Sequence, residues 1–132
     1  MSPELDKQLC EKYPELFKDR HADKRKTLMC WGFDCGDGWY GIIDDLCHNI
    51  MALCLDTNTI VPTVAQVKEK FGGLRFYLDS YSVDMDKAVT DAERISFSTC
   101  EVCGTAGKTR SGGWMKTLCD IHHAEREKKR NA

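Results

Sequence analysis

Three cysteines and one histidine near the C-terminus most constrain how this chain can fold. Cys100 and Cys103 are separated by two residues, fifteen residues follow, and Cys119 then precedes His122 at the same interval. Two ligands at this interval can bind one ion because a tight turn brings both sulfurs to one side, and Gly104 suits such a turn. The segment that begins at Cys119 is typical of a helix, in which residues i and i+3 share a face. The spacing therefore predicts that these four side chains bind one metal ion.

The ligand types predict a single structural Zn²⁺. Three thiolates and one imidazole form a closed tetrahedral site, which leaves no position for water or substrate. His123, one residue further along the same helix, is an alternative fourth ligand. Between the two ligand pairs, "GKTRSGGWMKTL" predicts a short hairpin that turns at Gly112-Gly113. A turn, a hairpin and a helix whose first turn supplies the last two ligands form the treble-clef arrangement of zinc modules.

The other five of the eight cysteines need a separate explanation. The N-terminal "MSPELDKQLC" is charged where a signal peptide is apolar, so we expect a cytoplasmic protein, in which disulfides are rare. An odd number of cysteines also cannot all be paired. We predict buried thiols rather than a second metal site for Cys30, Cys35, Cys47 and Cys54. No apolar run approaches the roughly 18 residues of a membrane span.

A long helix is predicted from Gly38 to Leu55. Its apolar residues recur at intervals of four and three, which is the period of one helical face. Asp37 is a plausible N-cap that would accept a hydrogen bond from the Tyr40 N–H. We expect this helix to form the centre of the core through one buried stripe: Trp39, Ile43, Leu46, Ile50 and Leu53.

A β-hairpin is predicted in "TVAQVKEKFGGLRFYLDS". Apolar and polar residues alternate on both sides of Gly72-Gly73, and a tight turn between strands needs the positive φ that glycine adopts. The apolar rows are Ala65, Val67 and Phe71 before the turn, and Leu74, Phe76 and Leu78 after it. A helix through "VAQVKEKF" is the competing interpretation. The same strands interleave basic with aromatic residues, a pattern found both in sites for single-stranded nucleic acid and in ordinary half-solvated hairpins.

Two further helices flank these elements. Ser2 and Pro3 are typical of a helix start, and the period of Leu5, Leu9 and Tyr13 continues the helix to about Tyr13. The second helix covers "MDKAVTDAERISFS", is capped by Ser82 or Asp84, and buries Ala88, Val89, Ala92 and Ile95. The fold class is therefore α+β, with a central amphipathic helix, a β-hairpin and flanking helices. The 132 residues fit one domain, with residues 1–98 as the α+β core and residues 99–132 as the zinc module.

The sequence resembles a group of small proteins encoded by bacteriophages and prophages. The resemblance rests on "CWGFDCGDGWYGIIDDLC", "QVKEKFGGLRFY" and "CEVCG…GWMKTLCDIH", in this order, and extends from about Leu5 to His122. It implies a phage origin, a location in the cytoplasm of a bacterial host, and a C-terminal zinc ribbon. In that group the last ligand pair is Cys-x2-Cys or Cys-x2-His, which favours His122 over His123. The resemblance implies no activity and no catalytic residue.

Charge is segregated along the chain although the formal net charge is only −2. No Lys or Arg occurs from Thr27 to Val67, whereas the C-terminal quarter is basic. Our leading hypothesis is a non-enzymatic protein whose acidic stretch binds a host protein, as in counter-defence or host takeover, through Asp34, Asp37, Tyr40, Asp44 and Asp45. The first alternative is a nucleic-acid-binding or regulatory zinc module that uses Lys108, Arg110, Trp114 and Lys116. The second is an enzyme that uses Asp34, Asp37, Asp44 and His48.

Overall fold

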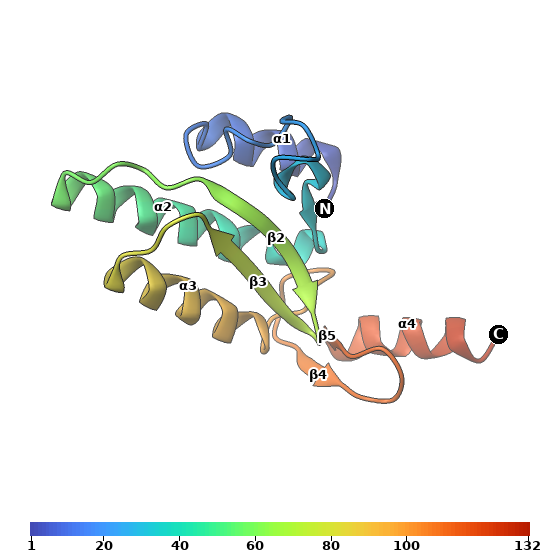
Figure 1. Cartoon of the computed structure of the whole chain (residues 1–132). Helices are drawn as coiled ribbons and strands as arrows, with labels where there is room; N and C mark the ends of the chain where they lie inside the picture. Colours follow the sequence, from blue (N-terminus) through green and yellow to red (C-terminus); the bar gives the residue numbers. More distant parts are fainter.

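The computed structural model describes residues 1–132 and shows an α+β protein (Figure 1). The helices are α1 (Pro3–Lys12), α2 (Tyr40–Thr57), α3 (Val83–Ser96) and α4 (Asp120–Arg130), with two 3₁₀ turns, η1 (Met29–Trp31) and η2 (Asp37–Trp39). The strands are β1 (Phe33–Asp34), β2 (Val64–Lys70), β3 (Gly73–Leu78), β4 (Lys108–Arg110) and β5 (Lys116–Leu118). None of the helices combines the length and the apolar character needed to span a bilayer.

The predicted hairpin forms the centre of a three-stranded sheet. β2 pairs with β3 in antiparallel register and with the short β1 in parallel register. The two-residue turn consists of Phe71 and Gly72, with φ of 54° and 85°, so it lies one residue before the predicted Gly72-Gly73 turn. Phe71 is therefore not in the buried row, and its side chain is 62% exposed. A bulge at Ala65 also changes the alternation, and Val64 takes the buried position expected for Ala65.

The central helix packs beneath this sheet beside α3 (Figure 1). Trp39, Ile43, Leu46 and Ile50 are buried as predicted, whereas Leu53 is only half-buried. The predicted N-cap is wrong. The N–H of Tyr40 donates to the backbone carbonyl of Asp37, and the Asp37 carboxylate accepts instead from the N–H of Ser2 at 2.7 Å. The helix starts at Tyr40 and continues to Thr57, where Asn58 adopts a left-handed conformation.

The flanking helices follow their predicted caps. The Ser2 hydroxyl accepts from the N–H of Leu5 at the start of α1, and the Ser82 hydroxyl accepts from the N–H of Met85 at the start of α3. The buried face of α3 consists of Met85, Val89, Ala92 and Ser96. Ile95 was expected on that face but is 45% exposed, because the face turns toward the sheet one residue later, at Ser96. The Ser96 hydroxyl is buried there and accepts from the N–H of Leu74.

The C-terminal segment contacts the core at the β2–β3 turn and at the start of α2. β4 and β5 form a separate two-stranded hairpin, which leads into α4 (Figure 1). The Thr117 hydroxyl, fully buried on β5, donates to the carbonyl of Gly72 at 2.6 Å. The indole N–H of Trp39 donates to the carbonyl of Thr99 at 2.9 Å. The start of α2 and the β2–β3 turn are thus both fastened to this segment.

Candidate metal centre

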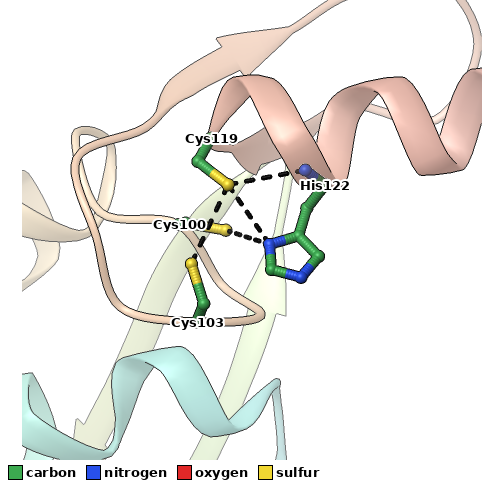
Figure 2. Close-up of side chains that lie close together, drawn as sticks. All are labelled: Cys100, Cys103, Cys119 and His122. Atoms are coloured by element: carbon green, nitrogen blue, oxygen red, sulfur yellow. Dashed lines mark hydrogen bonds between the residues drawn. The ribbon is translucent and has the colours of Figure 1, made fainter.

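Cys100, Cys103, Cys119 and His122 converge on one point (Figure 2). Their ligand atoms all lie within 4.8 Å of one another, and they form the one cluster of metal-ligating side chains in the chain. Cys119 caps the N-terminus of α4, and its sulfur accepts from the backbone N–H of His122. This cap fixes the helix start, so both C-terminal ligands point to the turn that carries the first two.

The spacing of the ligand atoms fits a tetrahedral zinc ion. With Zn–S bonds of about 2.3 Å, two sulfurs of a tetrahedron lie about 3.8 Å apart. The sulfurs of Cys103 and Cys119 are separated by 3.8 Å. The Nδ1 atom of His122 lies 3.2 Å from the sulfur of Cys119 and 3.6 Å from that of Cys100. The four residues therefore could hold a single metal ion, with Nδ1 rather than Nε2 as the histidine ligand.

Local hydrogen bonds favour the thiolates of Cys103 and Cys119, whereas burial raises the pKa of Cys100. Hydrogen bonds from the Thr105 hydroxyl and N–H lower the pKa of Cys103 to about 7, and the His122 N–H lowers the pKa of Cys119. Gly104 has a φ of 80°, and its N–H closes the turn by donating to the carbonyl of Cys100. The thiolate is the form that binds metal, so these contacts prepare the turn for ligation.

The second histidine does not join the cluster. His123 is absent from the four converging ligands, and its buried Nδ1 has no hydrogen-bond partner. The other ring nitrogen of His122 lies 4.0 Å from the Glu125 carboxylate, one turn further along α4. Metal-bound histidines commonly direct their free N–H toward a carboxylate, which fixes the ring orientation. Of the two histidines that the sequence offers, the geometry therefore favours His122.

The metal-binding turn lies against two glycines, Gly36 and Gly38, the second of which was predicted as the first residue of the central helix. The Gly36 N–H donates to the Glu101 carboxylate at 2.9 Å, and the Gly38 N–H donates to the Glu101 carbonyl at 2.8 Å. A Cβ on Gly36 would lie 2.3 Å from the Glu101 carbonyl oxygen, and one on Gly38 would lie 2.2 Å from the Cys100 carbonyl oxygen. The glycines of "CGDGW" therefore allow the metal-binding turn to approach the start of α2. In the sequence, the two closely spaced glycines before Trp39 were the only sign that another part of the backbone approaches here.

Two of the basic residues proposed for nucleic-acid binding lie in internal ion pairs. The ammonium of Lys116 lies 3.1 Å from Glu69 and 3.3 Å from Glu101. Although burial lowers the pKa of Lys116, these carboxylates raise it overall. Arg110 donates to the carbonyl of Leu118 and pairs with Asp120 at 2.8 Å. Lys108 and Trp114 are exposed on the same hairpin.

The acidic residues proposed for partner binding are spread over different contacts. Asp44 pairs with Lys12 at 2.9 Å and accepts from the Tyr13 hydroxyl at 2.7 Å. Tyr40 donates to Gln8, whereas Asp34 and Asp37 are exposed near the N-terminal end of α2. His48, the proposed catalytic partner of Asp44, is exposed one turn further along α2. Only Asp45 faces α3.

Asp45 lies at the rim of a groove between α2 and α3. The groove has a volume of about 360 Å³ and an apolar floor: Ile42, Leu46, Leu53, Ala88, Ala92 and Ile95. Its charged residues are Asp45, Asp84, Asp91 and a single base, Lys87. The groove thus combines an apolar floor with a predominantly acidic rim, and sequence analysis missed it because its two walls are more than thirty residues apart.

The remaining cysteines are free thiols. Cys35, Cys47 and Cys54 are buried in the core, and Cys10 and Cys30 are half-buried. Burial raises the pKa of Cys35 to about 12, so this thiol stays protonated at neutral pH. Comparison of the chain with family models, with curated proteins and with solved structures finds no match.

Proposed function

We propose that this is a structural-zinc protein of phage origin that acts, without catalysis, by binding a host protein in the bacterial cytoplasm. The observation that carries the zinc assignment is the closed Cys3His cluster, whose four ligand atoms lie within 4.8 Å. Such a ligand set fills the coordination sphere of zinc, and the ion then contributes to folding rather than to chemistry. The order of the turn, the β4–β5 hairpin and α4 supports a treble-clef arrangement as part of this proposal.

The position of the site supports an architectural role for the metal. Zinc would hold the turn that presents Glu101, and Glu101 contacts Gly36, Gly38 and Lys116. Glu101 itself is only 6% exposed. A buried carboxylate is stable only where its hydrogen bonds are kept, so the ion would fix the relative positions of the central helix and the β4–β5 hairpin.

The groove between α2 and α3 is the surface that best fits a protein partner. An amphipathic helix can place apolar side chains on the floor, and its basic residues can pair with the acidic rim. The rim carries three carboxylates and one ammonium, and Asp91 also pairs with Arg94 at 3.7 Å. The two remaining carboxylates, Asp45 and Asp84, favour a basic segment by electrostatic complementarity. Asp45 is the one carboxylate of the acidic stretch that lines this groove, whereas Asp44 pairs with Lys12.

Paired charge reversals test this function. Tagged full-length protein is used to capture partners from a lysate of phage-susceptible bacteria, and each candidate is then purified and its affinity measured by calorimetry. We expect Asp45→Lys with Asp84→Lys to weaken the affinity at least tenfold. The matched control, Asp56→Lys with Asp86→Lys, makes the same charge change on the same two helices outside the groove and should leave the affinity unchanged.

The zinc content of all variants should stay equal to that of the unmodified protein. A partner that binds both double variants equally well would place its site elsewhere and contradict the groove proposal. Hydrolase or transferase activity that is lost when Asp44 or His48 is replaced would contradict the non-enzymatic role.

A further inference from the structure

The tips of the two hairpins lie together and expose aromatic side chains. Phe71 at the β2–β3 turn and Trp114 before β5 line one hollow of about 370 Å³, together with Met115. Phe71 is 62% exposed and Trp114 is 73% exposed. The hydrogen bond from Thr117 to Gly72 fastens one tip to the other, and Figure 1 shows the β2–β3 turn beside β5. A buried hydrogen bond therefore holds the two hairpin tips, which carry the two exposed rings, beside each other.

The backbone directs the Phe71 ring into solvent at an energetic cost. Phe71 has a φ of 54°, in the left-handed region that bulky side chains rarely adopt. Glycine or asparagine satisfies this position of the turn without strain, so folding alone does not require phenylalanine here. Conformational strain of this kind concentrates at functional sites, where the side chain contributes something besides stability.

Cationic side chains lie beside both rings. The Lys70 ammonium lies 5.5 Å from the centre of the Phe71 ring. Arg126 donates to the carbonyl of Trp114, and Arg130 lies against Gly112 and Gly113 of the same loop. Neither Lys70 nor Arg126 is paired with a carboxylate. Arg130 pairs with Glu127 at 3.1 Å, and the nearby Glu69 shares the ammonium of Lys116 with Glu101. The hollow thus combines two exposed rings with cationic side chains available to a ligand.

We infer that this hairpin-tip surface, defined by Lys70, Phe71, Trp114, Met115, Arg126 and Arg130, binds single-stranded nucleic acid. Bases stack on exposed aromatic rings regardless of sequence, and basic side chains beside the rings contact the phosphates. A protein partner would also use aromatic residues, but the two cations without carboxylate partners, Lys70 and Arg126, favour a polyanion. This surface differs from the α2–α3 groove, so the inference does not depend on the protein partner proposed above.

The test is fluorescence anisotropy with labelled oligo-dT and oligo-rU of about 12 nucleotides, within the range of single-strand sites. We expect binding by the full-length, zinc-loaded protein at about 50 mM salt, with a slope of log K against log salt of about −1.4, since each of the two unpaired cations contributes about −0.7. Phe71→Gly and Trp114→Ala should each weaken binding by about tenfold. Phe71→Gly should unfold at an equal or higher urea concentration, because glycine relieves the strain at this turn.

Two matched controls separate this surface from general effects. Trp31→Ala removes another ring, 68% exposed and outside this surface, and should leave binding unchanged. Lys70→Gln should make the salt slope less negative by about 0.7, whereas Lys7→Gln on α1 should not change it. The inference is overturned if neither oligonucleotide binds at about 50 mM salt, or if Phe71→Gly and Trp114→Ala bind as the unmodified protein does. It is equally overturned if these variants lose a purified protein partner while oligonucleotides bind to none of the forms.

Discussion

The backbone N–H of Gly38 donates to the carbonyl oxygen of Glu101 across 2.8 Å, which ties the start of the central helix to the residue after the first metal ligand. The two residues are 63 positions apart in the chain. The contact is possible because Gly38 has no side chain, and it makes the metal-binding turn part of the structure around Trp39. Metal binding and core stability should therefore be coupled.

Adding a methyl group at Gly38 tests this coupling. In Gly38→Ala the new Cβ would lie 2.2 Å from the Cys100 carbonyl oxygen, so one backbone has to move. We expect a loss of about 1–3 kcal/mol in the free energy of unfolding, together with weaker zinc retention. Gly41→Ala is the matched control, because nothing lies within 4 Å of its Cβ and alanine favours the helix by about 0.5–1 kcal/mol. Urea unfolding measures the stability of both variants. A Gly38→Ala protein that is as stable as Gly41→Ala would disprove the close approach.

Removal of the metal should affect a defined part of the chain. Hydrogen exchange before and after chelation should show loss of protection from Cys100 to Arg130 and at the start of α2, since zinc binding and local folding are one equilibrium in such sites. The amides of β2 and β3 should stay more protected, because their ladder depends on the core cluster. Unchanged protection at the metal-binding turn would contradict a structural role for the ion.

The central helix makes a prediction about core packing. Leu46 is 2% exposed, and Leu46→Ala should cost about 2–5 kcal/mol in the free energy of unfolding. Leu55→Ala on the same helix removes the same atoms from a side chain that is 81% exposed, and should change stability by less than about 0.5 kcal/mol. Thermal or urea unfolding of the two variants measures the difference. A cost below about 1 kcal/mol for Leu46→Ala would show that this face is not buried.

The contact between α1 and α2 predicts a dependence on pH. Burial raises the pKa of Asp44, but hydrogen bonds from Lys12 and Tyr13 lower it overall from the ordinary value of 3.8. A lowered folded-state pKa adds stability above the unfolded value, and that stability is lost as pH falls through the folded value. The stability difference between the unmodified protein and Asp44→Asn should therefore be constant from pH 7 to about pH 5 and shrink below about pH 4. Both proteins lose metal in acid, so the difference between them isolates Asp44. If the stability difference between the two proteins grows as the pH falls, the pKa of Asp44 is not lowered in the folded protein.

The parts of the fold that depend on local periodicity could be predicted from the sequence. The long helix follows from the spacing of Trp39, Ile43, Leu46 and Ile50, and the four ligands follow from their intervals, since a turn and a helix start set both positions locally. The turn lies at Phe71-Gly72, one residue before the predicted position, because the alternation pattern places Phe71 in the buried row. Alternation cannot show that a phenylalanine occupies a left-handed position.

The surfaces were harder to predict because they depend on contacts between distant residues. Lys116 is part of a basic run, yet its partners are Glu69 and Glu101. Asp44 and Asp45 are neighbours in the acidic stretch, yet the first pairs with α1 and the second faces α3. A run of like charges in the sequence does not reveal which members are neutralised in the fold.

The most direct test of the central claim is metal analysis of the purified full-length protein, combined with X-ray absorption at the zinc edge. The account predicts one zinc ion per chain, coordinated by three sulfurs and one nitrogen, from Cys100, Cys103, Cys119 and His122. His122→Ala should replace the nitrogen or release the ion, whereas His123→Ala should leave the coordination shell unchanged. Protein that folds without zinc, or a shell of oxygens, or one that changes with His123→Ala and not with His122→Ala, would contradict the account.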